Sequence, residues 1–107
     1  MDFVNEITGS DYYAHHSLNV NPSSNFFKLH SHNAFELYLF LEGNGKINIE
    51  GKFFKLEPWD LFFIFPGEFH QVLLEPDTRY ERKVIRFDYS FIRSVDSEDY
   101  LINSFSR

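Results

Sequence analysis

Cysteine is absent from this 107-residue chain, which excludes both a disulfide framework and a metal site built on thiolates. The sequence also lacks an apolar run long enough to cross a membrane, and acidic residues stand where a signal peptide would have its basic segment. Basic residues are few, ten against sixteen acidic ones, and the net charge of −6 disfavours contact with DNA phosphates. A local pattern for an activated serine or threonine nucleophile is missing as well. We therefore expect a cytoplasmic chain that neither enters a membrane nor binds DNA by itself.

Aromatic residues, in contrast, are abundant. They make up 20% of the chain, with 14 Phe and 6 Tyr, and this composition favours strands over helices. Turn residues recur at short intervals, as in Gly43-Asn44-Gly45 and Pro66-Gly67. One all-β domain, a sandwich or barrel, follows from the length and this spacing. The predicted strands are Tyr12–Val20, Phe26–His30, Glu36–Leu41, Lys46–Glu50, Phe53–Glu57, Leu61–Phe65, His70–Glu75 and Tyr80–Asp88.

Two of these segments, Leu37–Leu41 and Leu61–Phe65, do not alternate between apolar and polar residues, so we expect them to be buried on both faces. After Tyr89 the pattern changes to a broken helical stripe. We divide the chain into an N-terminal arm (1–11), a barrel (12–90) and the start of a helical linker or dimerisation segment (91–107). The stripe predicts a homodimer interface, unless it folds back onto its own barrel; its residues are Ile92, Val95, Ile102 and Phe105.

Four residues with metal-binding side chains stand at fixed spacing. His30, His32 and Glu36 lie in the run HSHNAFE, and His70 ends the run FPGEFH. Residues two apart in a strand point to the same face, so His30 and His32 can enter one cavity. Imidazole and carboxylate donors suit a divalent transition metal such as zinc, nickel, manganese or iron. The alternative is a pocket that keeps these residues for hydrogen bonding alone and holds no metal.

Aromatic residues near this set are candidates for a ligand pocket. Tyr38 and Phe40 share parity with Glu36 and are therefore expected to face inward. Phe35 could also wall the pocket, and Trp59 could stack on a sugar or an aromatic ligand. An aromatic-rich core explains the same residues about as well.

The spacing His30-Ser31-His32, three residues, Glu36, six residues, Gly43 resembles the first motif of the cupin superfamily. The run Pro66-Gly67-Glu68-Phe69-His70 resembles the second, although the residue that usually separates its proline and glycine is missing. The resemblance implies an antiparallel cupin barrel (a double-stranded β-helix) with metal-ligand roles for His30, His32, Glu36 and His70. It does not choose among dioxygenases, isomerases, storage proteins and sensors.

A longer pattern is similar to the N-terminal sensor domain of AraC-type transcription regulators. It includes Glu36-Leu37-Tyr38, Ile49-Glu50-Gly51-Lys52 and the segment from Ile85 to Ile92; Trp59 stands where that family usually has glycine. The resemblance implies a small-molecule effector, with a sugar as one candidate, and a homodimer. It also implies that DNA is contacted only through a helix-turn-helix domain that this chain does not include, and that the N-terminal arm could act as a lid.

Two other functions remain open. A small metal-dependent cupin enzyme, an isomerase or a dioxygenase, would use every residue of the same site. An empty cupin could instead serve only as a dimerisation module.

Overall fold

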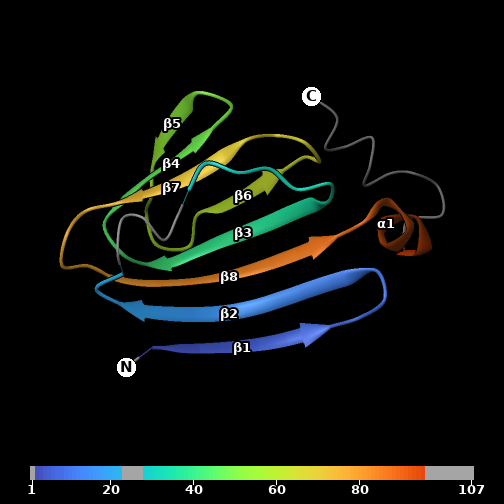
Figure 1. Ribbon diagram of the computed structural model, residues 1–107, viewed down its shortest axis with the longest axis horizontal. Coiled ribbons are helices and arrows are strands. Elements are labelled where there is room, and N and C mark those ends of the chain that lie inside the picture. Colours follow the sequence, from blue (N-terminus) through green and yellow to red (C-terminus); the bar gives the residue numbers. More distant parts are fainter. Residues whose placement is uncertain (1, 23–27, 96–107) are drawn as a thin grey trace.

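The computed structural model describes residues 2–22 and 28–95. This part of the chain forms eight strands followed by one short helix (Figure 1). The strands are β1 (Phe3–Thr8), β2 (Tyr12–Val20), β3 (Phe35–Glu42), β4 (Gly45–Ile49), β5 (Lys52–Lys55), β6 (Leu61–Ile64), β7 (His70–Leu74) and β8 (Arg79–Phe87), and the helix is α1 (Tyr89–Val95). Strand β2 has the predicted bounds, and each of β3 to β8 differs from its prediction by at most two residues at either end.

The strands form two antiparallel sheets. One has the order β1-β2-β8-β3-β6 and the other β5-β4-β7. The core lies between them, because Phe40 and Ile64 of the first sheet and Ile47 of the second are 0%, 1% and 0% exposed and belong to one packed cluster. The fold is therefore all-β, with sheets that face each other as in a barrel.

The barrel is not closed. Where the two sheets approach each other, His30 and His70 form a single antiparallel bridge, with backbone N–O distances of 3.0 and 2.8 Å. The predicted strand Phe26–His30 is therefore wrong at Lys28 and Leu29, which are not in a strand, and its other residues before Lys28 lie outside the described part of the chain. Among the described residues the pairing does not extend beyond this one bridge, so no ladder of hydrogen bonds joins the two sheets here.

The N-terminal residues differ from the expected arm. Residues Phe3–Thr8 form β1, which pairs with β2 along its whole length, from Phe3 opposite Leu18 to Thr8 opposite Tyr13. Five of its six residues are exposed, as expected for an edge strand. Residues Phe3–Thr8 of the segment predicted as an N-terminal arm are thus an edge strand.

The expectation of strands buried on both faces is only partly met. In β3, buried residues alternate with half-buried ones, and Leu61 in β6 is 62% exposed. The half-buried face carries a cluster of aromatic rings: Phe35 stacks on Phe87 with ring centroids 5.5 Å apart, and Phe91 of α1 packs on Phe87 at 5.7 Å. The helix thus covers one end of the outer face of this sheet.

Helix α1 begins at a well-formed cap. The Asp88 carboxylate accepts a 3.0 Å hydrogen bond from the backbone N–H of Phe91, and this contact lowers the pKa of Asp88 together with a bond from Ser90. Ile92 is 5% exposed within its own chain, so its assignment to an exposed interface stripe is wrong. Ile102 and Phe105 lie outside the described residues.

Among residues 2–22 and 28–95, no helix has both the length and the apolar character that a membrane crossing requires.

Candidate functional site

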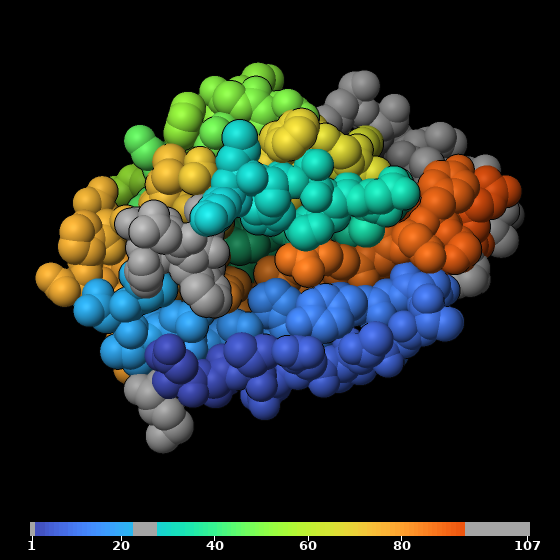
Figure 2. Space-filling model, viewed as in Figure 1, coloured from blue at the N-terminus to red at the C-terminus, as the bar shows by residue number. Residues whose placement is uncertain are grey.

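A cavity of about 90 Å³ lies between the two sheets. The space-filling view shows a hollow between β2 and the segment that leads into β3 (Figure 2). The five-stranded sheet contributes most of the polar lining, and the three-stranded sheet contributes Ile47, Val72 and His70. The lining residues are His15, His30, Glu36, Tyr38, Ile47, His70, Val72, Tyr80, Arg82, Val84 and Arg86.

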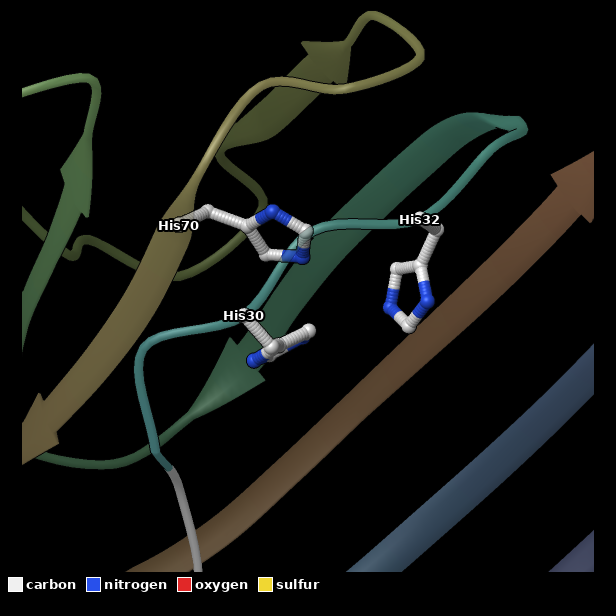
Figure 3. A group of neighbouring side chains, drawn as sticks. All are labelled: His30, His32 and His70. Carbon is white, nitrogen blue, oxygen red and sulfur yellow. The ribbon is translucent and has the colours of Figure 1, made fainter.

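Three of the four predicted metal ligands come together at this cavity. One ring nitrogen from each of His30, His32 and His70 lies within 4.8 Å of the others (Figure 3). His30 and His70 are held side by side by their backbone bridge, and their ring centroids are 4.1 Å apart. His32 follows two residues later and lies on the same side as His30, although neither residue belongs to one of the eight strands.

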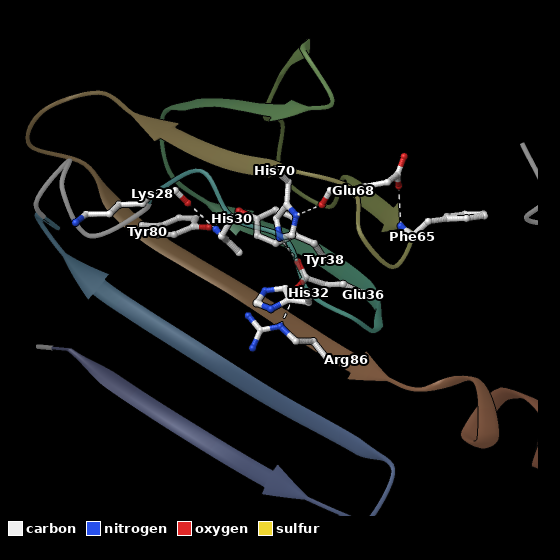
Figure 4. A network of polar contacts seen from close by, with 10 residues as sticks. All are labelled: Lys28, His30, His32, Glu36, Tyr38, Phe65, Glu68, His70, Tyr80 and Arg86. Carbon is white, nitrogen blue, oxygen red and sulfur yellow. Dashed lines mark hydrogen bonds and ion pairs between the residues drawn. The ribbon is translucent and has the colours of Figure 1, made fainter.

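Backbone carbonyls set the tautomer of two of these rings. The Nδ1 atom of His30 lies 2.5 Å from the Lys28 carbonyl oxygen, and Nδ1 of His70 lies 3.1 Å from that of Glu68 (Figure 4). A carbonyl oxygen can only accept a hydrogen bond, so each Nδ1 carries the proton and donates it. Each Nε2 therefore presents a lone pair, which is how metal-binding histidines are commonly oriented.

Burial favours the neutral form of two of these imidazoles, His32 and His70. It lowers the pKa of His32 to about 4, with a further contribution from the positive charge of Arg86. Burial also lowers the pKa of His70, and the nearby Glu36 carboxylate opposes that shift. Neutral imidazole is the form that binds a metal or accepts a hydrogen bond from a ligand.

Within the described residues, Nε2 of His32 and Nε2 of His70 are buried and have no hydrogen-bond partner. Buried polar atoms without partners are rare in native proteins, and such an atom often marks the place of a bound water, ion or ligand. The three histidines therefore fit a divalent metal, which would act there as a Lewis acid. Occupancy by a metal stays a prediction.

Glu36 lies beside the histidines but is held by a different partner. Its carboxylate oxygens are 3.5 Å from Nε2 of His70 and 3.8 Å from Nε2 of His32. The closest contact is a 2.9 Å hydrogen bond that Oε1 accepts from Nε of Arg86. Three histidines thus form the candidate metal-binding group, and Glu36 lies between that group and Arg86.

The predicted pocket residues divide into two groups. Tyr38 lines the cavity, and its hydroxyl is hydrogen-bonded to that of Tyr80. Phe40 faces inward as expected but is fully buried in the core, deeper than the cavity wall. Phe35 lies on the opposite face of β3, in the outer aromatic cluster, because alternate residues of a strand point to opposite sides. Trp59 is 74% exposed in the turn before β6, so the structure places neither Phe35 nor Trp59 at the cavity.

Strand β8 contributes polar residues to the cavity that the sequence motifs do not reveal. Tyr80, Arg82 and Arg86 share one parity in this strand and all line the cavity. Two arginines at the inward parity of a half-buried strand are an unusual pattern that could have indicated a polar site. The motifs do not reveal His15 either. It lines the cavity, and its Nδ1 atom is hydrogen-bonded to the Ser17 hydroxyl, with 2.8 Å between Nδ1 and Oγ.

Two facing antiparallel sheets with a histidine cluster between them define this protein as a cupin. The model of the AraC-like ligand binding domain family matches residues 18–100, and the chain belongs to that family. No curated protein matches the chain.

Solved structures agree with this assignment. A cupin protein from Bacteroides fragilis is 26% identical, with a TM-score of 0.62 over 82% of this chain and 78% of that one. A predicted oxalate decarboxylase from Thermotoga maritima is 27% identical, with a TM-score of 0.59 over 69% of this chain and 64% of that one. A putative mannose-6-phosphate isomerase from Ralstonia eutropha shares the fold, with 12% identity and a TM-score of 0.65 over 82% of this chain and 85% of that one.

Proposed function

We propose that this chain is the small-molecule-sensing and dimerisation domain of an AraC-type transcription regulator that acts in the cytoplasm. Its DNA contact would be made by a helix-turn-helix domain that the 107 residues do not include. The observation that carries the proposal is the polar cavity between the sheets of a domain that belongs to the AraC-like ligand binding family. The effector would bind in that cavity.

Strand β8 would couple ligand binding in the cavity to an attached DNA-binding domain. Arg82 and Arg86 of this strand line the cavity, and the chain passes through Asp88 directly into α1. A ligand that binds one arrangement of β8 better than another would shift the population of α1 positions. In a twofold homodimer, that shift would change how two attached DNA-binding domains are presented to their half-sites.

A fusion experiment tests this proposal. The chain is joined to a DNA-binding domain that acts only as a dimer, and reporter expression is measured with and without candidate effectors. We expect repression or activation that depends on an added small molecule, and a dimer in light scattering. A monomeric fusion that never responds, or specific DNA binding by the isolated chain, would contradict the proposal.

The histidine cluster supports a second candidate, a small metal-dependent cupin enzyme. The three clustered imidazoles fit a metal, and two of the similar structures carry enzyme names, a predicted oxalate decarboxylase and a putative mannose-6-phosphate isomerase. Measurable turnover of a carboxylate or sugar substrate by the metal-loaded chain would favour the enzyme. A chain that binds no small molecule and still dimerises would instead be a dimerisation module.

A further inference from the structure

The charges that line the cavity are unequal. Two guanidinium groups, those of Arg82 and Arg86, face it from β8, and the Glu36 carboxylate is the one acid among the lining residues of the described chain. Arg82 is only 8% exposed, and the Glu36 side chain is 4% exposed, so bulk water screens these charges weakly. The lining therefore carries an excess of one positive charge.

The neighbouring strands do not cancel this excess. Burial lowers the pKa of Arg82, a shift that the Asp2 carboxylate opposes, and burial together with Glu6 raises the pKa of Tyr13, but neither acid lines the cavity. Glu81 alternates with Arg82 along β8 and pairs with His16, 2.5 Å away. Burial lowers the pKa of His15, the lining residue from β2, so it is not expected to add charge at neutral pH.

Both arginines are held in fixed positions. Arg82 donates from Nη1 to the Asn19 side-chain oxygen, and its guanidinium lies 4.4 Å from the centre of the Tyr80 ring. Arg86 uses Nε for Glu36, and its guanidinium lies 5.8 Å from the Tyr13 ring centre. Groups that are ordered before a ligand arrives lose little entropy when they bind it.

Arg86 retains donors for a further partner. Among residues 2–22 and 28–95, its only hydrogen bond is the one from Nε, so its two Nη groups have no acceptor. Figure 4 shows the Nη end of this side chain turned away from Glu36, beside His32. A planar guanidinium edge of this kind matches the two oxygens of a carboxylate.

We propose that the effector is a small molecule with a single carboxylate, bound in this cavity by the Nη groups of Arg86 and by the positive field of Arg82. A monoanion balances the excess charge, and a cavity of about 90 Å³ has room for a short-chain compound. The hydroxyls of Tyr38 and Tyr80 and the lone pairs of the histidines would contact its neutral polar groups. The inference rests on the proposed sensing function and names the ligand class that this function would use.

Binding of carboxylates and of their uncharged counterparts tests the proposal. Thermal shift and calorimetry are run with sodium pyruvate and L-lactate against hydroxyacetone and propane-1,2-diol, at constant ionic strength and with EDTA present. We expect the carboxylates alone to raise the melting temperature. Arg86→Met should weaken their binding on the order of tenfold or more, the loss expected for hydrogen bonds to a charged group.

Two matched variants separate binding from folding. Arg79→Met removes an exposed arginine from the same strand and should leave carboxylate affinity unchanged. Arg86→Lys keeps the charge without the planar edge, so its affinity should fall between those of the wild type and Arg86→Met. If Arg86→Met does not fold by circular dichroism, Arg86→Lys and Arg79→Met still decide the question.

Several outcomes would overturn the carboxylate assignment: no shift with either carboxylate, equal shifts with the neutral compounds, or a shift with inorganic phosphate alone. The sensing proposal can fail separately. A reporter fusion that responds to a neutral effector would keep the sensor and reject the carboxylate. Carboxylate binding to a chain whose fusion never responds would keep the ligand class and reject the sensor.

Discussion

Glu36 and Arg86 stand opposite each other in the ladder between β3 and β8, and Nε of Arg86 donates a 2.9 Å hydrogen bond to Oε1 of Glu36. The Glu36 side chain is 4% exposed and that of Arg86 is 31% exposed, so the arginine connects a buried carboxylate to the open side of the cavity. A residue that the sequence motif assigns to metal binding is thus also half of an ion pair.

Removing Arg86 should destabilise the protein by leaving the Glu36 charge buried without a partner. We expect Arg86→Met to lower the free energy of unfolding by about 2–4 kcal/mol, measured by urea denaturation. The control, Arg79→Met, breaks the exposed pair with Glu42 and should cost less than about 1 kcal/mol. Glu36→Gln combined with Arg86→Met should cost less than the sum of the single changes, and strict additivity would contradict a direct interaction.

The stability of the protein should depend on pH through His32. Its pKa is about 4 in the folded chain and has the ordinary value of 6.5 when unfolded, so between these values the unfolded chain binds more protons. The free energy of unfolding should therefore be highest above pH 6.5 and should fall as the pH drops from 6.5 toward 4. His32→Gln should flatten this part of the profile. Parallel profiles for the wild type and His32→Gln would disprove the assignment.

Local sequence patterns predicted much of this fold for an identifiable reason. Gly43, Gly51 and Pro66 mark turns, and turns determine where the strands begin and end. The two-residue period placed Glu36, Tyr38 and Phe40 on the inward face of one strand, and the structure confirms this. These features depend on residues close together in the chain.

The features of the site that the sequence patterns did not predict depend on pairing between segments far apart in the chain. The arginines of β8 reach the cavity because β8 lies between β2 and β3. This order pairs residues between 39 and 75 positions apart and is not encoded in any short motif. The position of Phe35 follows from the same pairing, since its stacking partner Phe87 lies opposite it on β8.

Metal affinity should respond to Arg86 in the opposite direction from protein stability. Arg86 repels a cation at the three histidines and occupies one Glu36 oxygen, so its removal should strengthen Zn²⁺ or Mn²⁺ binding by about tenfold. Calorimetric titration of the wild type and Arg86→Met measures this change. His30→Gln should abolish binding, His16→Gln should not affect it, and EDTA should reverse it. Weaker metal binding by Arg86→Met than by the wild type would show that Glu36 is not available to the metal.

The backbone conformation of Trp59 should destabilise the folded protein. It follows Pro58 in the turn before β6 with a φ of 75°, in the left-handed region where such a turn favours glycine. The turn is held by hydrogen bonds between Glu57 and Asp60 and by the 2.7 Å bond from the Trp59 N–H to the Phe40 carbonyl, so the chain cannot relax there. Because the indole is 74% exposed, little packing is lost when it is removed.

Trp59→Gly should therefore raise the free energy of unfolding by about 1 kcal/mol, measured by urea denaturation. Trp59→Ala is the matched control, because it removes the same ring but keeps the Cβ atom that makes a positive φ unfavourable. We expect Trp59→Ala to stay near or below the wild type, so that the difference between the two variants reports the backbone strain alone. Equal stability of the glycine and alanine variants would mean that the turn changes shape when the ring is absent, and that the indole itself holds Trp59 in the left-handed conformation.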